Sequence, residues 1–236
     1  MDDDQDARTK PSVDLATLKK TVALRFVFVL LIFGLMFFWP AGTFRYWQAW
    51  TYMAIIFIPM LGVLAYFLRN DPKLLERRMR TKEKERKQKW IIGLSLPAYL
   101  AAFLLPGFDR RYGWSAVPLI IVIIADVLVL AGYGLGVRVM RENRYASRVI
   151  EVEEDHRVIT TGPYAVIRHP LYLAGLIIYL LSPLALGSFW AVLPALSLVF
   201  VIIARLRSEE QVLTEKLPGY KEYLQRVRFR LIPGIW

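Results

Sequence analysis

The apolar residues of this chain come in long blocks, and this pattern constrains the fold more than any other feature. Each block has about 17 to 25 residues, the length that an α-helix needs to cross the hydrocarbon core of a bilayer. Hydrophobic residues make up 56% of the 236 residues. In a soluble domain they would be spread with the period of a helix or a strand instead. The sequence therefore predicts an integral membrane protein, with expected membrane segments at 22–40, 46–68, 90–107, 114–136, 171–187 and 188–204.

The basic residues between these segments predict their orientation. Segment 69–89 carries ten Lys and Arg residues, segment 137–170 carries six arginines, and the tail after Ala204 carries seven Lys and Arg residues. Lys and Arg accumulate on the cytoplasmic side of membrane proteins. Both termini and all three basic segments should therefore face the cytoplasm. Within 69–89, Asp71 followed by Pro72 predicts a helix start.

These observations predict an all-α membrane bundle of five to six transmembrane helices. The short segments at 171–204 should form a C-terminal helical hairpin, and the polar segments around it a cytoplasmic cofactor-binding cap. We expect two regions: 1–136, with transmembrane helices and the basic loop 69–89, and 137–236, which carries the chemistry. The N-terminus has no eukaryotic targeting signal that we recognise, which favours a prokaryotic plasma membrane as the location.

Charge and cysteine content exclude several functions. The chain has no cysteine, which excludes disulfides, thiolate metal sites and cysteine nucleophiles. Its formal net charge is +11, but in a membrane protein such an excess indicates contact with anionic lipid head groups rather than nucleic acid. We therefore expect membrane lipids as partners and no nucleic acid. The sequence carries no indication of an oligomeric state.

Segment 114–136 contains an acid and a glycine cluster. Asp126 lies about 11 residues, or roughly 17 Å, from the cytoplasmic end of its helix. An acid at bilayer depth needs a partner or a wet cavity, and we favour a structural acid facing the bundle over a proton path. Gly132, Gly134 and Gly136 follow no strand, so they indicate close helix packing rather than a dinucleotide site.

A polar and aromatic cluster lies at 160–175, directly before an apolar segment. Pro170 restricts His169 to an extended backbone and suits the first position of a helix. His169 then lies at a helix N-terminus, where N–H groups and the dipole favour an anion. Tyr172 lies near the same rim, and a Gly-Pro turn can bring Tyr164 back toward it. The result is a cup suited to a carboxylate and to a flat ring or a cation, or else a plain interfacial belt.

A second constellation follows the last apolar segment. Arg205 and Glu209 are spaced i and i+4, on one helix face at the membrane boundary. An ordinary ion pair at this spacing contributes only a few tenths of a kcal/mol. The predicted hairpin, however, returns this helix to the side of His169. Arg205 and Glu209 can then give the cup an anion clamp and a hydrogen-bond acceptor.

Together these two pieces resemble the isoprenylcysteine carboxyl methyltransferase family and its relatives, the membrane phospholipid methyltransferases. The resemblance covers about Val137 to Trp236. The matching residues are Gly162-Pro163-Tyr164, Arg168-His169-Pro170-Leu171-Tyr172 and Arg205-Leu206-Arg207-Ser208-Glu209-Glu210, followed by Leu213, Tyr220, Tyr223 and Leu231-Ile232-Pro233.

The resemblance implies a methyltransferase that uses S-adenosylmethionine (SAM), with no metal and no Rossmann sheet. Arg205 and Glu209 would be the catalytic residues, with Arg205 facing the acceptor and Glu209 also binding the donor. The other donor-binding residues that it implies are His156, Arg157, Val158, Ile159, Tyr164, His169, Pro170, Leu171, Tyr172 and Glu210. The acceptor that the resemblance implies would be a lipophilic molecule that enters from the bilayer. Its reactive group is either the carboxylate of a prenylcysteine-like molecule, which needs no general base, or a lipid head group such as an amine, which must lose a proton.

Two other classes of protein remain alternatives. Membrane reductases of the sterol or steroid type use NADPH and have a similar Arg-His-Pro-x-Tyr helix start. They typically have an acid shortly after the tyrosine, whereas Tyr172 is followed by Leu173, Ala174, Gly175 and Leu176. The other alternative is a non-enzymatic lipid-binding membrane protein.

Overall fold

The computed structural model describes residues 14–79, 86–143, 145 and 157–236. Within these residues the regular structure consists of eight α-helices and one short 3-10 helix, without strands, which confirms the all-α prediction. The helices are α1 (Leu15–Ala41), α2 (Trp47–Asn70), α3 (Pro72–Met79), α4 (Arg86–Tyr112), α5 (Leu119–Glu142), η1 (Gly162–Ala165), α6 (Pro170–Ala185), α7 (Val192–Lys216) and α8 (Tyr220–Arg226).

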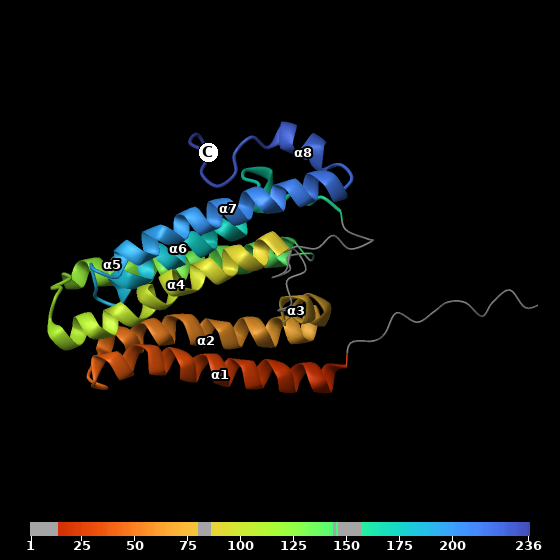
Figure 1. Ribbon diagram of the computed structural model, residues 1–236. Helices are drawn as coiled ribbons and strands as arrows, with labels where there is room; N and C mark the ends of the chain where they lie inside the picture. Colours follow the sequence, from red (N-terminus) through yellow and green to blue (C-terminus); the bar gives the residue numbers. More distant parts are fainter. Residues whose placement is uncertain (1–13, 80–85, 144, 146–156) are drawn as a thin grey trace, which may run out of the picture.

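The long helices lie side by side as one bundle (Figure 1). Helix α5 packs mainly against α6, and α4 packs against both α1 and α7. Among the described helices, α1, α2 and α5 are long and apolar enough to cross a membrane. Helix α6 is apolar but has only 16 residues, a length of roughly 24 Å.

Two expected helix boundaries were wrong. Helix α5 begins at Leu119 rather than at 114, because Pro118 stands directly before it with an extended ψ of 141°. Helix α7 begins at Val192 rather than at 188, and it continues without a break to Lys216. The polar residues that follow the apolar part of α7 therefore belong to the same continuous helix.

Helices α5 and α6 approach closely where α5 has a glycine. A Cβ atom on Gly132 would lie only 2.9 Å from Ile177 Cγ2 and 3.3 Å from the Ala174 carbonyl oxygen. The expected role of Gly132 in close helix packing is confirmed. Gly134, two residues further on, has no atom within 4 Å of such a Cβ.

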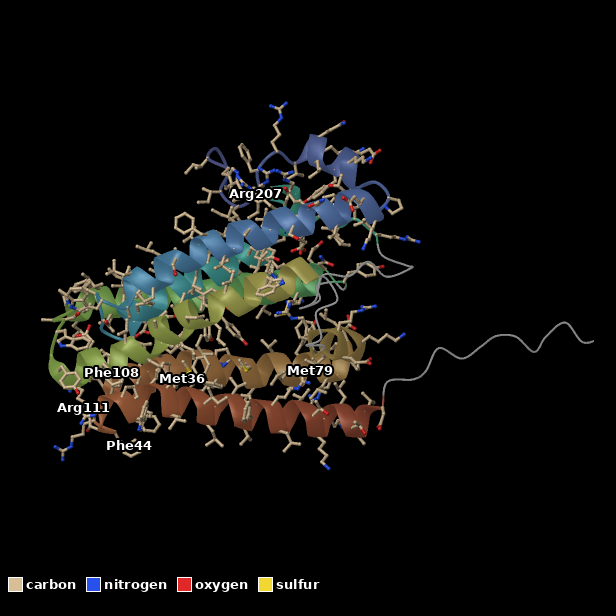
Figure 2. The ribbon with its side chains drawn as sticks, in the orientation of Figure 1. Met36, Phe44, Met79, Phe108, Arg111 and Arg207 are labelled. Carbon is tan, nitrogen blue, oxygen red and sulfur yellow. The ribbon has the colours of Figure 1, made fainter. Side chains whose placement is uncertain are left out.

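A buried acid ties together two connections at one end of the bundle. Asp109 is 1% exposed and accepts hydrogen bonds from the backbone N–H and the hydroxyl of Ser115, both at 2.6 Å. It also accepts one from the Ser188 hydroxyl. The α4–α5 connection is thereby joined to the α6–α7 turn. Figure 2 shows Phe108 at this end and Met79, the last residue of α3, at the opposite end.

The opposite end of the bundle gathers the polar elements. It holds α3, the start of α6, the end of α7, and α8 (Figure 1). Leu74 N donates to Asp71 Oδ1 at 3.1 Å, which confirms the expected cap of α3. Leu74 and Leu75 are buried in an apolar cluster that includes Leu171, in the first turn of α6. Helix α3 packs against α2 and α1, and Leu171 packs against the apolar cluster that these helices share.

Candidate functional site at the start of α6 and the end of α7

The hydroxyl of Tyr172 joins two residues of α7. It donates to Glu209 Oε2 at 2.5 Å and accepts from Arg205 Nε at 3.2 Å. Tyr172 lies in the first turn of α6, whereas Arg205 and Glu209 lie one turn apart on α7. The antiparallel packing of α6 and α7 thus brings three of the predicted site residues together.

The helix start at Pro170 has the predicted form. Pro170 is the first residue of α6, and His169 stands before it as the N-cap with a φ of −127°. The first N–H groups of a helix have no partner within the helix. They give this helix start a partial positive charge. The start of α6 is therefore suited to hold an anionic group near Tyr172.

The turn before α6 depends on a glycine. Gly162 has a φ of +56°, and a Cβ atom there would lie 2.9 Å from the Glu142 side chain. Glycine adopts this left-handed conformation at no steric cost. The turn continues into the 3-10 helix η1, with Pro163 near its start. As predicted, it places Tyr164 beside the other site elements.

Tyr164 is fixed from two sides. Asn143 Nδ2, directly after α5, donates to its hydroxyl oxygen at 2.9 Å, and the Tyr223 hydroxyl of α8 donates to its backbone carbonyl at 2.7 Å. Burial, with a smaller contribution from the Glu209 carboxylate, raises the pKa of Tyr164 to about 12. The Tyr164 hydroxyl is therefore neutral at physiological pH and can donate a hydrogen bond.

Glu210 has quite different surroundings from Glu209. It is 8% exposed, and its Oε1 lies 3.1 Å from Arg168 Nη1 and 3.2 Å from His169 Nε2. Its Oε2 accepts from Arg230 Nε at 2.8 Å. We call Glu210, Arg168, His169 and Arg230 the Glu210 latch.

Electrostatics favour an ionised Glu210. Burial by itself raises its pKa, but hydrogen bonds from His169 and Arg230 and the charge of Arg168 outweigh burial. The pKa of the Glu210 carboxyl therefore lies below its usual value. The carboxylate is charged at neutral pH, and both of its oxygens are held by the latch.

Backbone hydrogen bonds reinforce the latch. Arg168 N donates to the Phe229 carbonyl at 2.9 Å, and His169 N donates to the Arg230 carbonyl at 3.0 Å. The C-terminal segment is thus paired with the residues that lead into α6. Sequence reasoning missed this pairing and the part that Arg230 plays. The one sequence feature that could have indicated the role of Arg230 is the pair of adjacent acids in α7, Glu209 and Glu210, because neighbouring helix residues can face different partners.

Arg157, Val158 and Ile159, three further predicted site residues, lie in the segment before η1. Val158 packs against the cluster of Leu217, Tyr220 and Tyr223 under α8. Ile159 is half-buried and Arg157 is exposed. Asn143, which holds Tyr164, was not predicted, because a single asparagine at a helix end carries no distinctive pattern. His156 lies outside the described residues.

Asp126 lies away from this centre. It faces the bundle and is 6% exposed, and its Oδ1 has no hydrogen-bond partner among the described residues. Its structural role stays a prediction.

The geometry defines a helical protein with a polar site where two antiparallel helices meet beyond their apolar runs. In this site the Glu209 carboxylate lies close to the N-terminus of α6, to Arg205 and to the hydroxyl of Tyr172. This combination can bind a polar ligand that carries a positive and a negative group. The apolar helix faces beside it suit a lipophilic ligand.

Comparison with known proteins shows a family resemblance over part of the chain. Residues 120–219 match the model of the phospholipid methyltransferase family, a range that contains α5 except for its first residue, all of α6 and α7, and the Tyr172, Arg205 and Glu209 cluster. The family resemblance predicted from the sequence is confirmed for this region. The matched range covers 100 of the 236 residues.

A curated relative agrees over part of its length. Over 133 residues the chain is 29% identical to the cobalt-zinc-cadmium resistance protein CzcN of Cupriavidus metallidurans. The alignment covers 54% of this chain and 56% of that protein. The chain therefore matches a little over half the length of this relative.

Proposed function

We propose that the protein transfers a methyl group from SAM to a lipophilic acceptor at the cytoplasmic face of a membrane. The observation that carries the proposal is the Tyr172 hydroxyl, which joins Arg205 and Glu209 within the region that matches the methyltransferase family. A Rossmann sheet is not needed for such a site. The N-terminus of α6 can supply the partial positive charge that the donor's carboxylate requires, and Glu209 can supply the negative charge that its ammonium requires.

The residues at the start of α6 fit the donor. Tyr172 N and Leu173 N already donate to the His169 carbonyl, so the Leu171 N–H and the positive end of the α6 dipole would hold the carboxylate of the donor. Glu209 would accept hydrogen bonds from its ammonium group or its ribose hydroxyls, and the ring of Tyr164 would lie against its sulfonium. The stretch from His156 to Ile159 would complete the wall under α8.

The side chains of Glu210 and Leu171 would act less directly. The Glu210 carboxylate is held by Arg168, His169 and Arg230, so we assign it to positioning the helix start rather than to direct contact with the donor. Leu171 packs toward the apolar cluster at α3, and it would shape the wall between donor and bilayer.

The donor, when bound, supplies an activated methyl group on a sulfonium. The protein's part is to orient the acceptor, which Arg205 does by pairing with its anionic group. A carboxylate acceptor of the prenylcysteine type is already ionised at neutral pH and needs no base. With a head-group amine, Glu209 or a water molecule held by it would take the proton.

The arrangement in the membrane belongs to the same proposal. Five to six helices would cross the bilayer, with segments 137–170 and 205–236 forming a cap on the cytoplasmic side of a prokaryotic plasma membrane. Region 1–136 would anchor the bundle, and region 137–236 would carry out the transfer. The acceptor would enter from the bilayer between helices, and membrane lipids would be the protein's surroundings.

A transfer assay tests this proposal. The full chain, purified in detergent, is incubated with methyl-labelled SAM and either a total lipid extract or a prenylated cysteine. Label should enter the organic phase with one acceptor class, and Glu209→Gln should abolish it. Arg226→Gln, an exposed arginine of α8 outside the site, should have no effect. Absence of label with both acceptors, together with oxidation of NADPH, would favour the reductases instead.

A further inference from the structure

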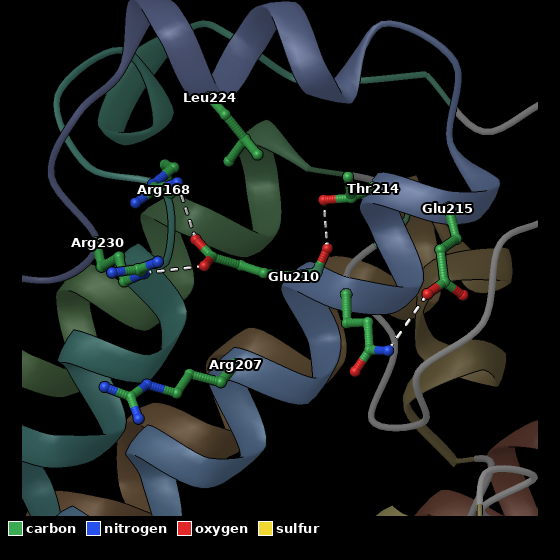
Figure 3. Close-up of a pocket in the computed structure, with 8 residues that line it drawn as sticks. Arg168, Arg207, Glu210, Thr214, Glu215, Leu224 and Arg230 are labelled. Atoms are coloured by element: carbon green, nitrogen blue, oxygen red, sulfur yellow. Dashed lines mark hydrogen bonds and ion pairs between the residues drawn. The ribbon is translucent and has the colours of Figure 1, made fainter.

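A second pocket lies on a different side of α7 from Tyr172. It has a volume of about 530 Å³ and opens between α7, α8 and the C-terminal segment (Figure 3). Arg168, Arg207 and Arg230 line it, together with Leu224 of α8. The described residues that line it do not include Tyr172, Arg205 or Glu209. The pocket is therefore separate from the proposed methyl-transfer site.

The charge of this pocket favours an anion. Glu210 is already bound by Arg168 and Arg230, while the exposed Glu215 accepts from Gln211 Nε2 at 3.3 Å. Three guanidinium groups thus face two carboxylates, and one of these carboxylates is fully engaged.

Two of the guanidinium groups retain unused donors. Arg207 is exposed and pairs with none of the residues that the structure describes. In Figure 3 its side chain extends from α7 toward the side on which Arg230 lies. The Arg168 side chain is only 9% exposed, yet its Nε has no hydrogen-bond partner within the described part of the chain. A buried guanidinium N–H without a partner costs free energy. An anion that accepted its hydrogen bond would remove this cost.

An exposed apolar stripe of α7 leads to the pocket. Leu193, Leu196 and Phe200 are 62%, 48% and 75% exposed, and their spacing of three and four places them on one helix face. The same spacing continues through the exposed Ala204 to Arg207. The stripe from Leu193 to Arg207 rises roughly 21 Å. A single leaflet of hydrocarbon is about 15 Å thick, half of a bilayer core of about 30 Å.

We propose that this pocket binds the phosphate group of a membrane phospholipid whose acyl chains lie along the α7 stripe. The phosphate would bridge Arg207 of α7 to Arg168 and Arg230 of the Glu210 latch. The stripe fixes the source of the phosphate, because it places apolar chains and phosphate donors on one continuous face. This lipid is a bound partner at a site of its own, whatever the acceptor of the methyl group.

The test measures lipid binding, not methyl transfer. The full chain in an uncharged detergent is titrated with a short-chain phosphatidylglycerol, and bound lipid is counted by native mass spectrometry. Arg207→Gln should weaken binding of this lipid by about tenfold or more, the loss expected for charge-assisted hydrogen bonds. Arg226→Gln removes the same charge from an exposed arginine that does not line the pocket, and it should change the affinity less than about twofold. Phe200→Ser should weaken lipid binding without lowering the thermal unfolding temperature.

Two outcomes would overturn the proposal. Equal lipid affinity of wild type and Arg207→Gln would show that the pocket does not hold the phosphate. Inorganic phosphate that binds as tightly as the lipid and displaces it would show that the pocket serves a soluble anion. Because neither outcome depends on the methyl donor, both are distinct from failure of the proposed transfer.

Discussion

Glu209 and Glu210 are neighbours in α7, yet their carboxylates bind different partners. Glu209 accepts from the Tyr172 hydroxyl at 2.5 Å, whereas Glu210 is held by Arg168, His169 and Arg230 of the latch. Successive residues of a helix are about 100° apart around its axis, so two adjacent acids can face two sites. Glu209 faces the proposed ligand site together with Tyr172, and Glu210 fixes the C-terminal segment to the start of α6.

The two acids should therefore fail in different ways when they are neutralised. Glu210→Gln leaves Arg168 and Arg230 without their counter-charge, and we expect it to lower the free energy of unfolding by roughly 1–3 kcal/mol. Glu209→Gln should leave stability nearly unchanged and weaken binding of the donor product. Thermal unfolding followed by tryptophan fluorescence, with calorimetric binding on the same samples, separates the two effects. Equal destabilisation by both changes would contradict the claim that Glu210, and not Glu209, stabilises the fold.

Stability should also depend on pH through Glu210. Its folded pKa is lowered, so its stabilising contribution is complete above the pKa of the unfolded state, near 4.5, and is lost as pH falls through the folded value. The difference in unfolding temperature between wild type and Glu210→Gln should be largest at neutral pH and should shrink below pH 4.5. A difference that stays constant from neutral to acid pH would show that charge is not what holds the latch.

Loss of the Tyr172 hydroxyl should slow turnover. Tyr172→Phe keeps the ring but frees Arg205 and Glu209 from their common partner, and we expect a decrease in the methyl-transfer rate of roughly tenfold or more. Tyr112→Phe makes the same chemical change in an exposed ring at the far end of α4, and it should leave the rate unchanged. Arg205→Ala should lower turnover while the affinity for the donor product changes little. A similar loss of donor affinity would move Arg205 into the donor site.

Two of the three glycines of α5, Gly132 and Gly134, offer a matched pair for helix packing. Gly132→Ala places a methyl group 2.9 Å from Ile177 Cγ2, whereas Gly134→Ala meets nothing within 4 Å. We expect the first change to destabilise the protein by about 1–3 kcal/mol through overpacking and the second to be neutral or slightly stabilising. Thermal unfolding in the same detergent compares them, and two equal shifts would mean that α5 and α6 are not in close contact at Gly132.

The sequence was sufficient to predict the helices but not all of their ends. Block length and hydrophobicity depend only on neighbouring residues, so each expected segment contains a helix, although four of the six segments also include one or more non-helical residues at one end. The start of α5 was misplaced because the residues before Pro118 are apolar or neutral; besides the extended Pro118, the contacts of Ser115 with Asp109 hold these residues outside the helix. Such contacts depend on tertiary structure.

The site could be predicted where its residues share a helix or a turn. The i and i+4 spacing of Arg205 and Glu209 and the Pro170 helix start are local features. The Glu210 latch joins residues of α7 to Arg168 and Arg230, which lie far apart in the sequence, and the backbone pairing of His169 with Arg230 leaves no mark on either segment. Only the folded path of the chain past α8 brings these groups together.

Binding of the demethylated donor, S-adenosylhomocysteine, tests the central claim most directly. Isothermal calorimetry on the detergent-purified full chain, with NADPH as the comparator, should show one site for S-adenosylhomocysteine and none for NADPH. Glu209→Gln should weaken this site by about tenfold or more, since it removes a charge-assisted hydrogen bond. Binding of NADPH alone, or equal binding of S-adenosylhomocysteine by wild type and Glu209→Gln, would contradict the account.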